Sequence, residues 1–195
     1  MLTRLRPAAS RILARAAAPL ARLPADAYTV LGLAAVAPYL YAAARGRPVE
    51  AAVLLLVSAA LDALDGAVAR LRGEAGPRGA YLDSLLDRVA DAAYAAGLLL
   101  LGLNTLLVYL LAVGSLLVSY ARAKYESLTG RSMEGTGVME RGDRVIALAL
   151  VLLLVPHGRA AAETALALID LLVWSTFAER LARGYRELPR RPAGL

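Results

Sequence analysis

Four aspartates in one short stretch are the residues best suited to do chemistry. Asp62 and Asp65 are three residues apart, and Asp83 and Asp87 are four residues apart. Either spacing places two side chains on the same face of a helix. The link between the pairs, residues 71–78, is short and rich in glycine, so two helices joined by it run antiparallel. Their acidic faces then meet at one end of the helix pair.

Carboxylates gathered in this way predict a divalent-metal centre. Groups this close repel one another and do not all remain ionised without a counter-charge. Two divalent cations balance the charge of the aspartates, and carboxylate oxygens suit Mg²⁺ or Mn²⁺. The chain has no cysteine and one histidine, so thiolate sites and histidine clusters are excluded. A pair of such ions is a recurring arrangement for displacement at phosphorus.

Small and basic residues beside the aspartates extend the pattern to a phosphate site. Gly66 follows Asp65, and Gly79 precedes Asp83; glycine lets a ligand approach the backbone closely. Arg70, one turn after Gly66, is placed to pair with a phosphate. The combination predicts a metal-bound diphosphate. The alternative is that these charges only cap and solubilise helix ends. That alternative does not account for the two glycines at these positions.

The elements that position these residues are long apolar segments. Apolar residues make up 59% of the 195 and charged residues 19%, and the mean hydropathy is +0.57. In ordinary soluble domains, apolar residues make up roughly 45–50% and charged residues about 25%. Residues 92–121 are uncharged and lack the polar stripe of a soluble bundle, and Gly102-Leu103-Asn104 supplies a turn within them. We predict an all-α integral membrane bundle in one domain, 1–195, with six transmembrane helices, at residues 26–44, 49–71, 80–101, 104–123, 142–157 and 160–183.

Charge distribution predicts the orientation of this bundle. Of the 22 lysines and arginines, only Arg45, Arg47 and Arg159 fall on one side of the membrane. The positive-inside rule therefore places the aspartates and both termini in the cytoplasm. Residues 1–23 show helical apolar spacing interrupted by arginines, which predicts an interfacial amphipathic helix, with a disordered basic tail as the alternative. Residues 184–195 are expected to be a cytoplasmic tail. A net charge of +6 on so apolar a chain indicates membrane lipids or phosphorylated ligands and no nucleic acid.

The spacing of the acidic stretch resembles the signature of the CDP-alcohol phosphotransferase family, D-x2-D-G-x2-A-R-x8-G-x3-D-x3-D. The residues that match it are Asp62, Asp65, Gly66, Ala69, Arg70, Gly79, Asp83 and Asp87. The resemblance implies a membrane transferase, expected to be a homodimer. A CDP-linked lipid binds with its diphosphate on two metal ions, an acceptor alcohol attacks the lipid-side phosphorus, and CMP leaves.

The resemblance also implies roles for individual residues. Asp62, Asp65 and Asp83 would bind one ion. Asp83 and Asp87 would help to bind the second, and Asp87 would also be the general base. The CDP-lipid site would comprise Gly66, Ala69, Arg70, Gly79, Asp26 and Thr29. Asp26 and Thr29 fall where the family often has a Pro-Asn-x-x-Thr-like element, but the asparagine is absent here.

Basic residues around the fourth connection bear on the acceptor. They are Arg122, Lys124, Arg141 and Arg144, with Arg180 or Arg183 from the last helix as a fifth. Cations converging on one point suit an acceptor that itself carries a phosphate. The alternative is that the positive-inside rule alone accounts for them.

The pattern Ser-Tyr-x-basic-Ala-basic-x-Glu, followed by Gly-x-x-Glu-Arg-x-x-Arg, resembles the phosphatidylinositol-phosphate and archaetidylinositol-phosphate synthases. This resemblance implies inositol 1-phosphate as the acceptor, and glycerol 3-phosphate is the alternative. A small divalent-cation channel or transporter, or a non-catalytic membrane assembly protein, are interpretations from other classes. Neither of them requires the signature glycines and arginine at these spacings.

Overall fold

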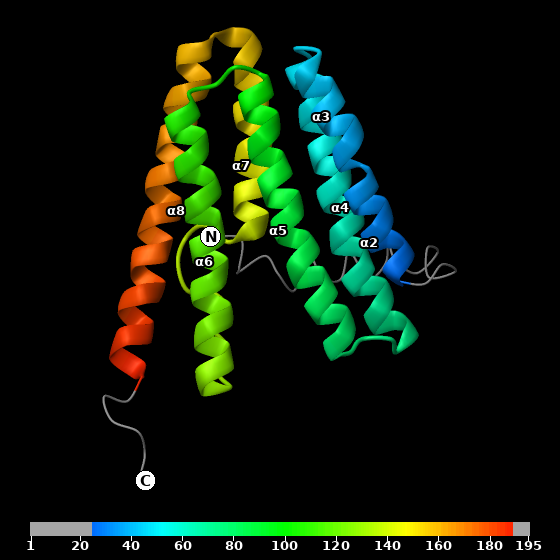
Figure 1. The fold of residues 1–195 in the computed structure, drawn as a ribbon, viewed down its shortest axis with the longest axis vertical. Coiled ribbons are helices and arrows are strands. Elements are labelled where there is room, and N and C mark those ends of the chain that lie inside the picture. Colours follow the sequence, from blue (N-terminus) through cyan, green and yellow to red (C-terminus); the bar gives the residue numbers. More distant parts are fainter. Residues whose placement is uncertain (1–24, 189–195) are drawn as a thin grey trace.

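The computed structural model describes residues 25–188, and every regular element among them is a helix. The elements are α2 (Ala25–Ala34), α3 (Val36–Ala44), α4 (Pro48–Arg72), α5 (Pro77–Leu100), α6 (Thr105–Thr129), α7 (Arg141–Leu154), the 3₁₀ turn η2 (Val155–His157) and α8 (Arg159–Glu187). Figure 1 shows them as rods that run up and down beside one another. The predicted interfacial helix, 1–23, and residues 189–195 of the predicted tail lie outside the described residues.

Two helix boundaries differ from the sequence prediction because of local capping. α5 begins at Pro77, three residues early, because Gly76 is its N-cap and a proline at the first helical position loses no hydrogen bond. α6 continues to Thr129, past the predicted end at residue 123. It stops at Gly130, whose φ of 64° is the left-handed conformation that commonly ends a helix. The turn predicted at Gly102-Leu103-Asn104 is confirmed, and the Asn104 side chain caps α6.

Prolines account for further differences. The helix predicted at 26–44 is divided into α2 and α3 at Ala35, because Pro38 has no N–H to donate to the carbonyl one turn before it. The helix predicted at 142–157 ends as an α-helix at Leu154, and Pro156 lies in the 3₁₀ turn that follows. α8 continues to Glu187, so the first residues of the predicted tail are helical.

Four described helical segments are long and apolar enough to cross a membrane: Ala27–Ala44, Pro48–Arg72, Thr105–Thr129 and Arg159–Glu187. The predicted count of six spans is not confirmed by this measure. α5 carries several charged side chains in its first half, and α7 has only 14 residues. At 1.5 Å per residue, 14 residues extend about 21 Å, short of a hydrocarbon core of about 30 Å.

A chain of hydrogen bonds fixes the relative placement of the helices that carry the aspartates. Tyr94 of α5 donates its hydroxyl to Ser58 of α4 at 2.8 Å, and Ser58 donates to the Gly32 carbonyl of α2 at 2.7 Å. Tyr39 of α3 donates to the Tyr94 carbonyl at 2.7 Å, and the two rings meet edge to face. Such interhelical bonds contribute about 0.6–2 kcal/mol each in a membrane. Because Ser58 lies one turn before Asp62, this chain sets the height of α4 beside α5.

α4 and α5 are antiparallel but do not pack along their length. α4 packs mainly on α2, α3 and α7, whereas α5 packs on α3 and α6. A cavity of about 720 Å³ therefore remains at the end of the helix pair where the two are joined. Figure 1 places this end opposite the connections α3–α4, α5–α6 and α7–α8.

Candidate active site

An acidic cluster lies between α4 and α5. Asp62, Asp83 and Asp87 each place one carboxylate oxygen within 4.8 Å of the others. Asp87 Oδ1 is buried and lies 2.8 Å from the guanidinium of Arg141. An all-oxygen set of three carboxylates fits a hard divalent cation such as Mg²⁺ or Mn²⁺. The predicted meeting of the two acidic faces is therefore observed for these residues.

Asp65 lies beside this cluster without belonging to it. Its side chain is buried and accepts a hydrogen bond of 2.7 Å from the Thr29 hydroxyl of α2. Asp65 and Asp83 both line the larger cavity. This hydrogen bond orients the Asp65 carboxylate. The sequence had placed Thr29 near the site only through its position in the family pattern.

The larger cavity brings together the predicted CDP-lipid residues. Its lining includes Thr29, Gly66, Ala69, Arg70 and Gly79, with Asp65, Asp83 and the α4–α5 link. A Cβ added at Gly66 would lie 3.4 Å from Arg70 Nη1, so the absent side chain leaves the guanidinium room beside the backbone. Asp26 lies in the first turn of α2, and its side chain is outside what the structure describes.

A second, smaller cavity has a volume of about 160 Å³. Its lining residues are Asp87, Arg88, Val118, Ser119, Arg122, Glu140, Arg141, Gly142, Arg144 and Arg180. Asp87, one turn after Asp83, thus faces the second cavity, while Asp83 faces the first. Each cavity is therefore lined by one member of the acidic cluster.

The structure divides the predicted acceptor residues into two groups. Arg122, Arg141 and Arg144 line the smaller cavity, and Lys124 and Arg183 do not. Lys124 is two residues after Arg122, which is about 200° around a helix, so both cannot face one cavity. Arg183 instead contacts Glu187 and the Thr136 hydroxyl. Of the two arginines of α8 considered as a fifth cation, Arg180 is the one in the lining.

Two arginines of α7 connect the basic cavity to the acidic cluster. Arg141 pairs with Asp62, and with Asp87 at 2.8 Å. Its Nε lies 3.4 Å from Asp91, and Arg144 Nη2 donates to the same carboxylate at 3.0 Å. A guanidinium has donors to spare, so Arg141 can contact the aspartates from one side of the cavity and still present N–H groups to a ligand.

Asp91, Arg88, Ser119 and Glu140 were absent from the predicted site. Asp91 continues the four-residue repeat of Asp83 and Asp87 along α5, which is the sequence signal that identifies it. Arg88 pairs with Asp87 at 3.1 Å. Ser119 and Glu140 stand in the sequence pattern that resembles the inositol-phosphate lipid synthases, and the way the α6–α7 loop folds back places Glu140 in the lining.

Divalent ions are expected to raise the thermal stability of the purified protein. A ligand that binds only the folded state stabilises it by about 2.7 kcal/mol at 100 times its Kd. Asp62→Asn and Asp83→Asn should reduce the rise in melting temperature that Mn²⁺ causes. Differential scanning fluorimetry of the protein in detergent measures this rise. Glu50→Gln, at the opposite end of α4, is the matched control. Equal shifts in all four proteins would contradict a metal site at this cluster.

Comparisons with known proteins agree with this arrangement. The family model for CDP-alcohol phosphatidyltransferase matches residues 22–177. The chain is 40% identical to the archaetidylinositol phosphate synthase of Aeropyrum pernix over 93% of this chain and 94% of that protein. The archaetidylinositol phosphate synthase of Pyrococcus horikoshii is 33% identical over 96% of this chain and 98% of that protein.

Solved structures give the same result. Phosphatidylinositol phosphate synthase of Mycobacterium tuberculosis with CDP-DAG bound aligns with a TM-score of 0.80 and 28% identity, covering 95% of this chain and all of that one. The same enzyme in complex with manganese and citrate aligns with a TM-score of 0.78 and 27% identity, over 87% and 88%. With its apolar helices, this chain is a multi-pass membrane transferase and not the channel of the alternative interpretation. The chain belongs to the CDP-alcohol phosphatidyltransferase family.

Proposed function

We propose that this protein transfers the lipid phosphate group of a CDP-linked lipid to inositol 1-phosphate and releases CMP. The observation that carries the proposal is that two different cavities are each lined by a member of one acidic cluster, Asp83 in the larger and Asp87 in the smaller. The larger is lined by the signature residues of the family, and the smaller is lined by arginines. The relatives named as inositol-phosphate lipid synthases support the choice of acceptor.

The donor is proposed to bind in the larger cavity. Arg70 would pair with its diphosphate, and Gly66, Ala69 and Gly79 would let that group approach the backbone. Asp62, Asp65, Asp83 and Asp87 would hold two Mg²⁺ or Mn²⁺ ions. These ions would neutralise the phosphate oxygens and make the phosphorus more electrophilic. We include Asp26 in this site on the strength of the family resemblance.

The acceptor is proposed to bind in the smaller cavity. Arg122, Arg141 and Arg144, joined by Arg88 and Arg180, would hold its phosphate. Its hydroxyl would then point toward Asp87, which lines the same cavity. Asp87 would accept the hydroxyl proton as the new P–O bond forms and the bond to CMP breaks.

The placement in the membrane is also a proposal. Six helical segments would span it, with α5 turning its charged side toward the site and α7 completing the cavity. The aspartates and both termini would be cytoplasmic, because the outer connections hold only Arg45, Arg47 and Arg159. The chain is taken as one domain and as a homodimer, which light scattering of the detergent-solubilised protein would test.

The test is CMP release by purified protein with CDP-archaeol or CDP-diacylglycerol and Mg²⁺ or Mn²⁺. The acceptors to compare are inositol 1-phosphate, glycerol 3-phosphate, free inositol and serine. Release only with inositol 1-phosphate is expected. Release only with glycerol 3-phosphate would retain the reaction and overturn the acceptor. No release with any of these acceptors would overturn the proposed acceptor class, and failure to bind the CDP-lipid would overturn the proposed reaction.

A further inference from the structure

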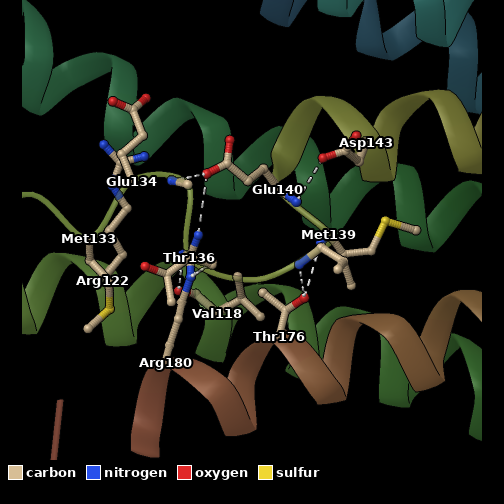
Figure 2. Close-up of polar contacts among 12 residues, drawn as sticks. Val118, Arg122, Met133, Glu134, Thr136, Met139, Glu140, Asp143, Thr176 and Arg180 are labelled. Carbon is tan, nitrogen blue, oxygen red and sulfur yellow. Dashed lines mark hydrogen bonds and ion pairs between the residues drawn. The ribbon is translucent and has the colours of Figure 1, made fainter. Parts of the chain in front are cut away.

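The loop between α6 and α7, residues 130–140, is bonded to α8. In Figure 1 it runs back along α6 and α8 to the start of α7, which is shorter than either. Figure 2 shows Arg180 reaching from α8 to this loop. Its Nε donates to the Thr136 carbonyl at 3.0 Å, and its Nη1 donates to the Val118 carbonyl of α6 at 2.9 Å. The guanidinium therefore joins α8, the loop and α6.

Thr176, one turn before Arg180, makes the second connection. Its hydroxyl donates to the Leu172 carbonyl at 2.8 Å and accepts from the backbone N–H groups of Val138 at 3.2 Å and Met139 at 3.1 Å (Figure 2). A threonine hydroxyl has one donor and two acceptor sites, so its capacity is filled. Thr176 is 0% exposed, and loss of its oxygen would leave loop N–H groups without their partner.

The loop approaches Thr176 so closely that its backbone has room only for glycine. Gly137 has a φ of +94°, and a Cβ added there would lie 2.2 Å from Thr176 Cγ2. Both the backbone conformation and the contact exclude a larger residue. The position of the loop against α8 is therefore specified at Gly137 as well as at the two N–H groups that follow it.

Met139, whose N–H is bonded to Thr176, also binds an arginine of the smaller cavity. Met139 accepts a hydrogen bond through its carbonyl from Arg144 Nη1 at 3.3 Å, and Arg144 is 3% exposed. The next residue, Glu140, is the N-cap of α7 and forms a reciprocal capping box with Asp143. Thr176 thus fixes the point at which α7 begins. The start of α7 in turn sets the positions of Arg141 and Arg144 in its first turn.

We propose that Thr176 is a positioning residue for the acceptor, which rests on the proposed function of the basic cavity. Thr176 does not line that cavity and has no contact with the aspartates. Its hydroxyl acts through the backbone of Met139, from whose N–H it accepts a hydrogen bond and whose carbonyl binds Arg144, so that Arg141 and Arg144 meet the acceptor phosphate. Its loss should weaken acceptor binding more than donor binding or the chemical step.

Thr176→Val tests this role, since valine keeps the shape and removes the hydroxyl. The KM for inositol 1-phosphate should rise about tenfold, the effect of losing somewhat more than 1 kcal/mol. The kcat and the KM for CDP-lipid should stay within about twofold. Thr176→Ser, which retains the hydroxyl, should restore the acceptor KM. Thr164→Val, at the opposite end of α8 where the hydroxyl bonds only within the helix, should behave as the unmodified protein.

The outcomes separate this inference from the proposed function. If the unmodified protein does not use a phosphorylated acceptor, the proposed function fails. If it does, and Thr176→Val leaves the acceptor KM unchanged, the positioning role is wrong. A fall in kcat together with an equal rise in both KM values would also overturn it, because a residue with a merely structural role would give that result. If Thr176→Val does not fold, Thr176→Cys, whose thiol is a weak acceptor, should show the same split at smaller amplitude.

Discussion

Replacing Asp87 with asparagine should lower the rate of CMP release by about three orders of magnitude. Asn is nearly the same size and retains an oxygen that can face a cation, but it cannot take up the proton of the acceptor hydroxyl. Asp87 is the one member of the acidic cluster that lines the arginine-rich cavity, where the acceptor is proposed to bind. Single-turnover assays with CDP-lipid and inositol 1-phosphate would measure the effect on the chemical step.

Donor and metal binding show whether this loss belongs to proton transfer. The Asp87→Asn protein should still bind CDP-lipid and should still be stabilised by Mn²⁺ through Asp62 and Asp83. Glu50→Gln makes the same chemical change at the far end of α4, where the side chain pairs only with Arg47, and should leave turnover unchanged. Turnover retained in Asp87→Asn would remove Asp87 as the base.

Replacing Arg141 with alanine should raise the KM for inositol 1-phosphate by about a hundredfold, since hydrogen bonds to charged groups contribute about 1.5–3 kcal/mol each. Arg141 lies between the acidic cluster and the basic cavity, in contact with Asp62 and Asp87. The KM for CDP-lipid should change much less, because Arg141 does not line the larger cavity, where the donor is proposed to bind. Steady-state CMP release with each substrate varied in turn measures both values.

Two further variants define the contribution of the guanidinium. Arg141→Lys keeps the charge but not the planar pair of donors, so its acceptor KM should be intermediate. Arg159→Ala removes an arginine at the opposite end of the bundle, where it pairs with Glu163, and serves as the matched control. An effect of Arg141→Ala confined to the CDP-lipid would show that Arg141 does not hold the acceptor phosphate.

Local spacing was sufficient to predict the acidic cluster. The turn of a helix fixes which side chains share a face, and the short link after α4 forces an antiparallel return. Asp62, Asp83 and Asp87 therefore converge once contacts with α2 and α3 have set the height of α4 beside α5. The same rule extends to Asp91, one turn beyond, and it separates Lys124 from Arg122. Apolar segment length similarly predicted where the helices lie, and caps and prolines moved several of their ends.

The acceptor side depended on contacts between residues far apart in the chain. Which arginines face the smaller cavity is decided by the rotation of α6, α7 and α8 about their axes, and by where the α6–α7 loop stops against Thr176. No sequence period links Thr176 with Gly137 and Met139, which are 37 to 39 residues away in numbering. The sequence by itself determined the helices, the signature aspartates and the charge of the site, because these follow from local geometry and composition. Only the tertiary structure decided which basic side chains line the smaller cavity, because helix rotation and loop docking are set by long-range packing and hydrogen bonds.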